Sequence, residues 1–398
     1  MSTATLRDIP LQDKRLFIRV DFNVPLTASR EVANDTRIRA ALPTITHAVT
    51  HGASVILASH LGRPRGQVDA ALSLQPVAAH LETLLHRPVR FAPDCIGAEV
   101  EAMARALQPG EVMMLENLRF HPEEEKNDAD FAKALAALAD VYVNDAFGTA
   151  HRAHASTAGI TLHLQPAVAG LLMENELRHL SRVTEQPEQP FVAILGGAKV
   201  SDKIPLITHF LDKVSALVVG GAMAYTLLQA QGYATGDSLV EPDCVPMARE
   251  LLEQAAARQV QFALPCDHVI AQTATADAAT RTVGDEGIPA GWMGLDIGPQ
   301  TVTRFRDIIT LAKTVVWNGP MGMFELEPFR QGTLDVARAV AACGGTSVVG
   351  GGDTIAALAQ CDCQEAITHI STGGGATLEF LEGKVLPGVA CLTDSDAL

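Results

Sequence analysis

Short apolar runs alternate along the chain with longer segments that mix apolar and polar residues at helical spacing. In the first half the runs are Leu16–Val20, Ser54–Ala58, Glu111–Leu115 and Asp140–Val143. In the second half they are Phe191–Leu195, Ala216–Val219, Gln261–Leu264, Thr314–Trp317, Ser347–Val349 and Ala366–Ile370. Such runs, separated by helices, are typical of parallel strands buried on both faces. The pattern predicts an α/β protein with two doubly wound, Rossmann-like parallel sheets.

A longer amphipathic segment lies between the two sets of runs. Residues 168–184 carry apolar side chains at positions 169, 173, 177 and 180, the stripe of a helix, and the Pro-rich segment 186–190 ends it. At 398 residues the chain exceeds a single comfortable core. We therefore expect two domains with this helix as their connector, although a plain surface helix would show the same stripe.

The segment FVAILGGAKVSDK, residues 191–203, combines a strand, a glycine turn and two lysines. We expect Lys199 to Lys203 to form the first turn of a helix, so that the two lysines share one face. Helix N-termini bind anions through free backbone N–H groups and the helix dipole. Two interpretations stay equally open at this point: a phosphate site, or a solvated lysine pair on an ordinary turn.

Basic residues follow the strands of the first half, at the sheet edge where ligands of such folds collect. They are Arg37 at the head of the first helix, Arg63, Arg119 and Arg152 after successive strands, and His60 and His151 among them. A single such arginine is often a surface ion-pair partner, and a single such histidine is often structural. Four arginines at equivalent strand ends repel one another unless anions offset their charge. We infer a small, multiply anionic substrate.

Glycine-rich turns follow strands of the second half in the same way. They are Asn318-Gly319-Pro320, Gly350–Thr354 and Thr372–Thr377, and the latter two open helices. Such turns bring bare backbone close to a ligand and offer further anion sites. Asp353 is expected either to cap its helix or to hold the magnesium of a nucleotide. Glu325 is either a solvated carboxylate or a ligand of ribose hydroxyls.

Composition and charge exclude several classes of protein. The net charge of −16 argues against a nucleic-acid partner, since such binding needs a basic face. No apolar run reaches the roughly 18 to 20 residues of a membrane helix, and the N-terminus lacks a signal-peptide core. We therefore expect a soluble cytoplasmic protein that does not bind membranes.

Cysteine spacing and the absence of common nucleotide-binding motifs argue against further classes of protein. The seven cysteines show no CxxC, and the only close pair, Cys361 and Cys363, lacks further ligands nearby in sequence, so we expect reduced thiols. Neither the GxxxxGK[ST] of a P-loop nor a GxGxxG after a strand is present. The second absence argues against a nicotinamide-dependent dehydrogenase.

Eight ordered motifs, spread from end to end of the chain, resemble those of the phosphoglycerate kinase family. They are RVDFNVP at 19–25, SHLGRP at 59–64, LENLRFHPEEEKN at 115–127, NDAFGTAHRAH at 144–154, GGAKVSDKI at 196–204, WNGPMGMFE at 317–325, GGGDT at 350–354 and STGGGATLEFLEGKVLPGV at 371–389. The resemblance implies reversible phosphoryl transfer between 1,3-bisphosphoglycerate and ADP, giving 3-phosphoglycerate and MgATP, by direct in-line transfer with domain closure. The alternative is a non-catalytic two-domain protein that binds an anion and a nucleotide.

The resemblance also implies a domain division. Residues 1–170 with 383–398 would bind the triose, 171–190 would form the connecting helix and hinge, and 191–382 would bind the nucleotide. The tail would thus pack back on the first domain. A monomer with ATP or ADP as co-substrate and Mg²⁺ as cofactor is expected.

Individual roles carried over from the family are expectations of the same kind. Substrate binding falls to Asp21, Phe22, Asn23, Arg37, His60, Arg63, Arg119 and Arg152. Nucleotide binding falls to Gly197, Ala198, Lys203, Gly294, Asn318, Pro320, Glu325, Gly351, Gly352, Asp353 and Thr354. Arg37, Lys199 and Lys203 would be catalytic, with backbone donors to the transition state at Gly352, Gly373 and Gly374. Asp353 would hold Mg²⁺, mainly through the nucleotide phosphates.

Overall fold

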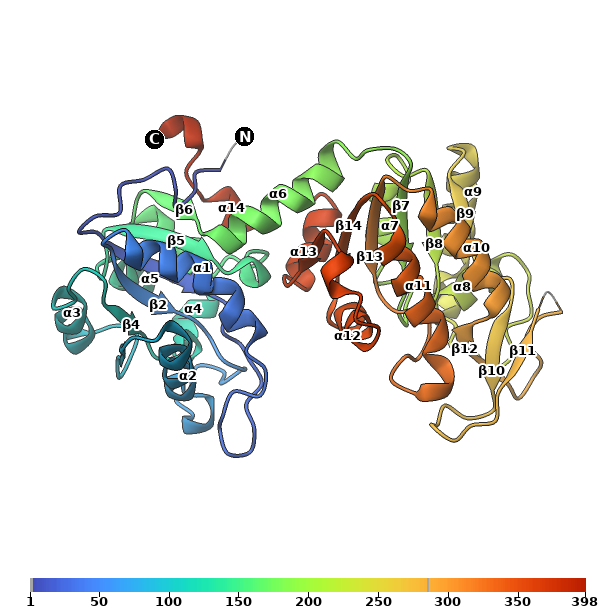
Figure 1. The fold of residues 1–398 in the computed structure, drawn as a ribbon, viewed down its shortest axis with the longest axis horizontal. Helices are drawn as coiled ribbons and strands as arrows, with labels where there is room; N and C mark the ends of the chain where they lie inside the picture. The colour runs from blue at the N-terminus through green and yellow to red at the C-terminus, as the bar shows by residue number, and fades with distance from the viewer. Residues whose placement is uncertain (1–2, 285) are drawn as a thin grey trace. The chain divides into compact units, whose positions relative to one another are not determined.

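The structure is a computed structural model that describes residues 3–284 and 286–398. The chain divides into two compact units: unit 1 is Met1–Arg178 with Val385–Leu398, and unit 2 is His179–Lys384. Each unit contains a six-stranded sheet in which every neighbouring pair of strands is parallel (Figure 1). The prediction of two doubly wound parallel sheets is confirmed.

The sheet of unit 1 has the strand order β3-β4-β2-β1-β5-β6. The strands are β1 (Arg15–Val20), β2 (Ser54–Ala58), β3 (Val89–Phe91), β4 (Val112–Met114), β5 (Val141–Asp145) and β6 (Ala167–Ala169). The winding reverses between β1 and β5, which are neighbours in register. Ligands of open parallel sheets bind at the carboxyl ends of the strands beside such a reversal.

Successive side chains along the strands of unit 1 point to opposite faces of the sheet, and each face is covered by its own hydrophobic core. On one face Leu16 and Ile18 pack with α1 (Thr36–Thr50) and α2 (Gln75–Leu85). On the other face Phe17 and Tyr142 pack with α3 (Ala98–Arg105) and α5 (Ala129–Ala136). The central strands β1 and β2 are therefore mostly apolar along their length, because both of their faces are covered.

The sheet of unit 2 has the strand order β15-β14-β13-β7-β8-β9, and its winding reverses between β7 and β13. The strands are β7 (Phe191–Leu195), β8 (Ala216–Val219), β9 (Gln261–Ala263), β13 (Thr314–Asn318), β14 (Thr346–Gly350) and β15 (His369–Ser371). The helices are α7 (Ile204–Phe210), α8 (Met223–Ala230), α9 (Val245–Ala257), α10 (Pro299–Thr310), α11 (Gln331–Ala342), α12 (Gly352–Gln360) and α13 (Gly375–Leu381). Ile194 and Trp317 lie in a core with α10 and α11, while the Phe191 ring meets Phe210 of α7 edge to face.

Several elements differ from the sequence prediction. The short strands β3 and β6 were missed, as was an antiparallel sheet of β10 (His268–Ala271), β11 (Arg281–Val283) and β12 (Met293–Ile297). Strand β15 begins at His369 and not Ala366, because Gln364–Ala366 forms a 3-10 turn. These strands are short and lie at sheet edges or outside the main sheets, so they lack a long apolar run.

The predicted connector helix begins later than expected. Helix α6 spans Leu171–Glu185, because Ala167–Ala169 pairs with β5 instead of starting the helix. Asp145, the last residue of β5, accepts hydrogen bonds from the backbone N–H groups of Leu172 (2.9 Å) and Met173 (3.2 Å). Burial raises the pKa of this carboxyl to about 6. The start of α6 is therefore fixed to the reversal point of the unit 1 sheet.

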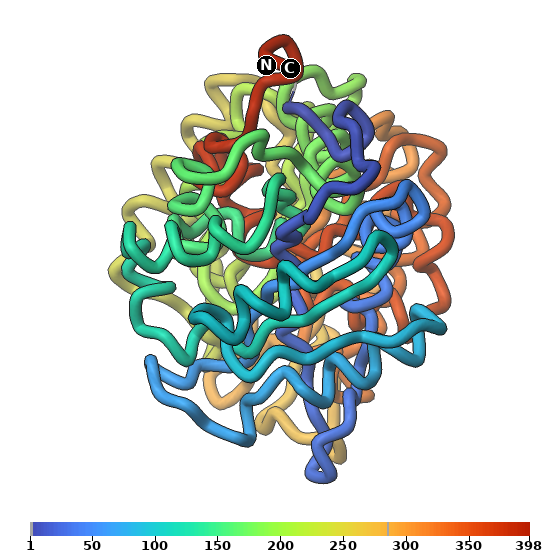
Figure 2. The backbone as a smooth tube through the Cα atoms, turned by 90° about the vertical axis from the view of Figure 1, so that its left-hand side faces the viewer, coloured from blue at the N-terminus to red at the C-terminus, as the bar shows by residue number. Residues whose placement is uncertain are grey.

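Both ends of the described chain belong to unit 1 (Figure 2). Thr3 forms a bridge with Asp394, and the Ala4 N–H donates to the Thr393 carbonyl at 2.9 Å. The short helix α14 (Pro387–Ala390) is held by the Asn144 amide, which donates to the Gly388 carbonyl at 2.8 Å. Residues 385–398 thus complete the same unit that the N-terminal residues begin.

Within residues 3–284 and 286–398, no helix combines the length and the apolar character needed to cross a membrane.

Candidate active site

A chain of polar contacts joins the predicted triose-binding residues at the carboxyl edge of the unit 1 sheet. Arg37, in the first turn of α1, lies 3.2 Å from the Asp21 carboxylate and donates to the Asn23 carbonyl at 3.1 Å. The Asn23 side-chain oxygen accepts from the Gly62 N–H at 2.9 Å. Arg119 then donates to the Gly62 carbonyl at 2.9 Å. Residues after β1, β2 and β4 are thereby brought together.

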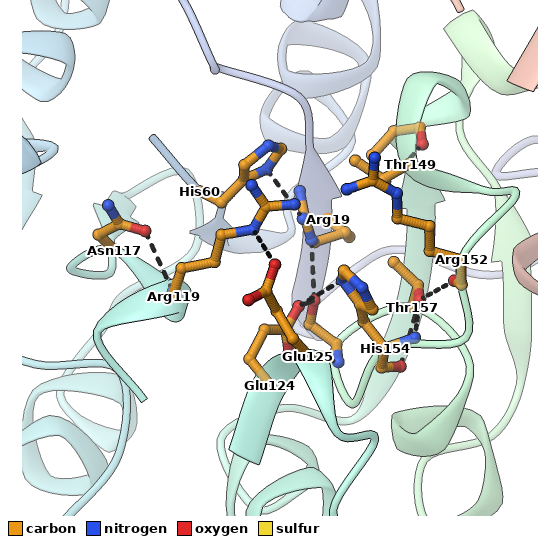
Figure 3. A network of polar contacts seen from close by, with 12 residues as sticks. Arg19, His60, Asn117, Arg119, Glu124, Glu125, Thr149, Arg152, His154 and Thr157 are labelled. Atoms are coloured by element: carbon orange, nitrogen blue, oxygen red, sulfur yellow. Dashed lines mark hydrogen bonds and ion pairs between the residues drawn. The ribbon is translucent and has the colours of Figure 1, made fainter. Parts of the chain in front are cut away.

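Arg119 is held in a nearly buried position. Its side chain is 5% exposed, and its Nε lies 3.3 Å from the Glu125 carboxylate of α4 (Pro122–Glu125). Figure 3 shows the dashed contact from its Nε to the Glu125 carboxylate. Burial lowers its pKa, and the charges of Arg19 and Arg152 act in the same direction. An anion in this cluster would relieve that repulsion.

His60 is neutral and its tautomer is set by Arg19. The Arg19 Nη2 lies 3.2 Å from the His60 Nδ1, and both side chains are buried (Figure 3). A guanidinium can only donate, so Nδ1 must accept and the ring proton sits on Nε2. Burial, then the Arg19 charge, holds the pKa of His60 well below its usual range. His60 therefore presents a neutral N–H donor.

The sequence prediction missed Arg19 and the groups that support it. Arg19 Nε donates to the Ser156 hydroxyl (2.8 Å), which donates to the buried Glu124 carboxylate (2.6 Å). His154 Nδ1 lies 3.8 Å from the same carboxylate, and burial lowers the pKa of His154 to about 4. A charged residue inside the apolar run of β1 was the available signal, because a fully buried arginine needs such partners.

The remaining predicted triose residues are placed differently. Arg63 is exposed, and its guanidinium has no hydrogen-bond or ion-pair partner among the residues the structure describes. Arg152 is also exposed and donates to the His151 ring at 3.1 Å. The Phe22 side chain is fully buried in the core, so only its backbone can face a ligand. Two arginines thus remain available to an external anion.

In unit 2, Lys199 and Lys203 do not share a helical turn. Helix α7 begins at Ile204 with Lys203 as its N-cap, so the predicted helix over residues 199–203 is wrong. The Ser201 N–H (3.1 Å) and hydroxyl (2.6 Å) both donate to the Glu241 carboxylate, and these bonds hold the segment as a turn. Lys199 is exposed, whereas Lys203 is only 9% exposed.

Lys203 links the N-terminus of α7 to the ends of two strands. Its ammonium donates to the Asn318 side-chain oxygen at the end of β13. The Asn318 amide in turn donates to the Gly350 carbonyl at the end of β14 (2.9 Å). Burial lowers the pKa of Lys203, although the Asp202 and Glu382 charges oppose that shift. A cation with one neutral partner is therefore positioned at the sheet reversal.

The loops after β7 and β13 approach each other backbone to backbone. The Gly197 N–H donates to the Pro320 carbonyl at 3.1 Å. A Cβ on Gly319 would lie 2.2 Å from the Gly196 carbonyl oxygen, and the φ of Gly319 is +99°. These positions require glycine, and they leave bare backbone beside Lys203.

Helix α12 presents its N-terminus at the same edge. Its N-cap is Gly351, with φ +95°, so the alternative that Asp353 is an N-cap is wrong. Asp353 lies in the first turn with its carboxylate exposed. The buried Thr354 hydroxyl accepts from the Gly319 N–H at 2.8 Å and so ties α12 to the loop after β13.

The other predicted nucleotide residues make less direct contacts. Gly294 lies in β12, where a Cβ would meet the Tyr225 hydroxyl at 2.0 Å. Gly374 has φ +55° and precedes α13, and the Gly373 N–H donates to the Ser371 hydroxyl at 3.3 Å. The exposed or partly exposed positions are Ala198, Pro320, Glu325 and Gly352.

The residues at this edge fit a magnesium nucleotide. Mg²⁺ is usually bound through one or two carboxylates together with substrate phosphates. Asp353 offers an exposed carboxylate at the N-terminus of a nine-residue helix, where phosphates are also favoured. The donor set therefore suits an ion that arrives with its nucleotide.

The chain is similar to known proteins along nearly its whole length. A model of the family described as "Phosphoglycerate kinase" matches residues 6–384. The phosphoglycerate kinase of Moorella thermoacetica is 59% identical over 394 residues, covering 99% of this chain and all of the relative. That of Roseiflexus sp. is 56% identical over 397 residues, with 99% and 100% covered.

Solved structures give the same result. The structure of phosphoglycerate kinase from Coxiella burnetii matches with a TM-score of 0.91 at 41% identity, covering 100% of both chains. That from Pyrococcus horikoshii matches with a TM-score of 0.84 at 32% identity, covering 99% of both chains.

Proposed function

The chain belongs to the phosphoglycerate kinase family, and on this premise we propose how its two units divide the reaction. The family assigns a phosphotransferase activity whose substrates are phosphoglycerate and ADP or ATP. The alternative of a non-catalytic binding protein is not favoured.

Unit 1 binds the triose. The support is the group of arginines at one sheet edge, where Arg63 and Arg152 are exposed and Arg119 is held beside Gly62. Bidentate guanidinium groups suit the phosphate of 3-phosphoglycerate. His60 adds a neutral Nε2–H donor, and Asp21 and Asn23 orient Arg37. These groups bind and orient an acidic substrate without having to change protonation.

Unit 2 binds the nucleotide. The N-terminus of α12 and the bare backbone at Gly197 and Gly319 suit phosphates, and Lys203 adds a buried cation. Glu325 is assigned to the ribose hydroxyls, and Gly294 and Pro320 to nucleotide binding. Magnesium bound at Asp353 would neutralise phosphate charge.

Transfer itself needs charge stabilisation more than proton transfer. The acceptor of the reverse reaction is a carboxylate, which is already ionised at neutral pH, so no general base is required. We assign Arg37 and Lys199 to the phosphoryl group in transit and Lys203 to the nucleotide phosphates. Backbone N–H groups of Gly352, Gly373 and Gly374 complete the donors. This set fits a loose, in-line phosphoryl transfer.

The two half-sites belong to different units, so transfer requires closure of the units on each other. Closure would also exclude water, which would otherwise hydrolyse the acyl phosphate. We assign the connector α6, whose start is fixed by Asp145, to the hinge region. A monomer acting in the cytoplasm completes the proposal.

The proposed division of roles rests on one observation. Unit 1 contains a cluster of arginines, and unit 2 contains its own group of anion-binding residues, a lysine and glycine-rich turns at the carboxyl edge of its sheet. The division is tested by measuring ATP formation from 1,3-bisphosphoglycerate and ADP with and without Mg²⁺, together with calorimetry of each ligand alone. We expect magnesium-dependent turnover and binding of each ligand alone. A folded protein that bound both ligands but showed no turnover would overturn the proposed catalytic roles.

A further inference from the structure

Unit 1 brings together three metal-ligating side chains that have no assigned role in the candidate active site. Asp94 and Cys95 precede α3, and His121 is the N-cap of α4. One donor atom from each, a carboxylate oxygen, a thiol sulfur and a ring nitrogen, lies within 4.8 Å of the other two. His121 Nε2 is 2.7 Å from Asp94 Oδ1. Two segments separated in sequence therefore supply a mixed O, S and N donor set.

We propose that Asp94, Cys95 and His121 bind a divalent ion of the zinc class, with water as a fourth ligand. Zn²⁺ binds sulfur at about 2.3 Å and nitrogen or oxygen at about 2.0 to 2.2 Å, usually as a tetrahedron. Donors around such an ion lie about 3.3 to 3.8 Å apart. The three atoms reach these separations if the Asp94 and His121 side chains open slightly and Cys95 turns toward them.

The surrounding contacts keep the three candidate ligands close to one another. The Cys95 backbone N–H donates to Asp94 Oδ1 at 2.6 Å, which keeps the Asp94 carboxylate beside Cys95. The His121 ring stacks on Phe131, with ring centres 5.2 Å apart and a 29° angle between the planes. Side chains that are already close to one another need only small movements to bind an ion, so they lose less conformational entropy on binding than free side chains would.

Burial gives the site an inner and an outer side. The Cys95 side chain is fully buried, whereas the Asp94 and His121 side chains are 47% and 26% exposed. An ion can therefore enter from solvent, and its water ligand would lie on the exposed side. Oxygen and nitrogen ligands with a single thiolate suit a borderline ion better than Mg²⁺, which prefers oxygen.

Metal binding breaks two bonds to hydrogen, the S–H bond of Cys95 and the Nε2–H bond of His121. The Cys95 S–H bond breaks as the sulfur–metal bond forms, and the proton passes to solvent. In the free protein the His121 Nε2–H donates to the Asp94 carboxylate. On binding, the Nε2–H bond breaks and an Nδ1–H bond forms by proton exchange with solvent, and Nε2 and the Asp94 carboxylate each bind the metal. No electrons are transferred, and no reagent besides the ion is needed.

The bound ion would stabilise the segment that contains Arg119. His121 directly follows the 3-10 turn Leu118–Phe120 and directly precedes α4, which carries Glu124 and Glu125. An ion bound by both His121 and the loop before α3 would link these two segments and so oppose the unfolding of unit 1. We therefore expect the thermal midpoint of the full chain to rise when the ion binds.

Cobalt titration of the metal-stripped full chain tests the proposal. Because Cys361 and Cys363 form a thiol pair elsewhere in the chain, with sulfurs 2.6 Å apart, the titration is done in a Cys361→Ser/Cys363→Ser background. We expect one equivalent of Co²⁺ to give a thiolate charge-transfer absorption, and Zn²⁺ to displace it. Cys95→Ala should abolish the absorption, while the matched change of another buried cysteine, Cys343→Ser, should leave it intact.

Two further variants keep the test decisive if Cys95→Ala fails to fold. Asp94→Asn and His121→Gln alter partly exposed side chains, and each should weaken Co²⁺ binding by at least about tenfold. Absence of a thiolate absorption in the background protein would overturn the proposal. So would an absorption of unchanged affinity in either of these variants or in Cys95→Ala.

Discussion

Replacing Arg119 separates the two half-sites most cleanly. Arg119→Ala removes a side chain that touches the Gly62 carbonyl and Glu125 but belongs wholly to unit 1. Its proposed role is to bind the triose, so nucleotide affinity should not change. Arg119→Lys keeps the charge while losing the planar fork, and we expect it to resemble the alanine variant more than the wild type.

The size of the effect follows from the contacts. A hydrogen bond to a charged group contributes about 1.5 to 3 kcal/mol, so 3-phosphoglycerate should bind about 10- to 150-fold more weakly. Stability should change less. The ion pair with half-exposed Glu125 is worth about 0 to 1 kcal/mol, and removing the charge relieves repulsion from Arg19 and Arg152. We expect a loss of about 1 to 2 kcal/mol, mainly from the buried stem.

Calorimetry with 3-phosphoglycerate and ADP in separate titrations measures both affinities, and urea unfolding measures stability. The matched control is Arg90→Ala, which removes a surface arginine of the same unit that pairs with Glu111 at 2.7 Å. Arg90→Ala should leave both affinities unchanged. The reasoning is refuted if Arg119→Ala weakens ADP as much as 3-phosphoglycerate, or if it weakens neither.

Three other changes probe the remaining features. Lys199→Ala should lower kcat by about two orders of magnitude or more with an unchanged thermal midpoint, and near-normal turnover would remove this lysine from the mechanism. Gly319→Ala should destabilise the protein by about 2 to 4 kcal/mol in denaturant unfolding, through positive φ and a clash with Gly196; the control Gly344→Ala, where a Cβ meets nothing within 4 Å, should not. Burial raises the pKa of Asp145 from 3.8 to about 6, so its protonated form contributes stability that is complete below about pH 4 and lost as pH rises through 6. Asp145→Asn should therefore gain unfolding free energy relative to the wild type between pH 4 and 7, and a constant difference would contradict the shift.

The central strands were predictable because they are buried on both faces. Ser54–Ala58, Phe191–Leu195 and Ala216–Val219 have the predicted bounds, since each apolar run ends at a polar or glycine residue. Strand β3, Val89–Phe91, has no such run: its arginine is exposed and its two apolar residues are only partly buried. Its position depends on pairing with β4, which a local pattern does not record.

The residues of the candidate site also differ in how far the sequence could predict them, and the difference is again between local pattern and long-range contact. Arg37 and Arg119 follow strands, so the parallel topology alone places them on one edge. The bonds that support Arg19 cross 137 positions of sequence to Ser156, and only the folded chain shows them. The turn at Lys199 was misjudged for the same reason, because Glu241 holds it from 40 positions away.

The pairing of residues 3 and 4 with residues 393 and 394 affects the order in which the nascent protein can mature. Residues 385–398 leave the ribosome only after all of unit 2 has been made. Until then Asn144 lacks the Gly388 carbonyl that accepts its side-chain hydrogen bond. Unit 2, whose residues are continuous in sequence, can therefore complete its contacts before unit 1, although it is synthesised later.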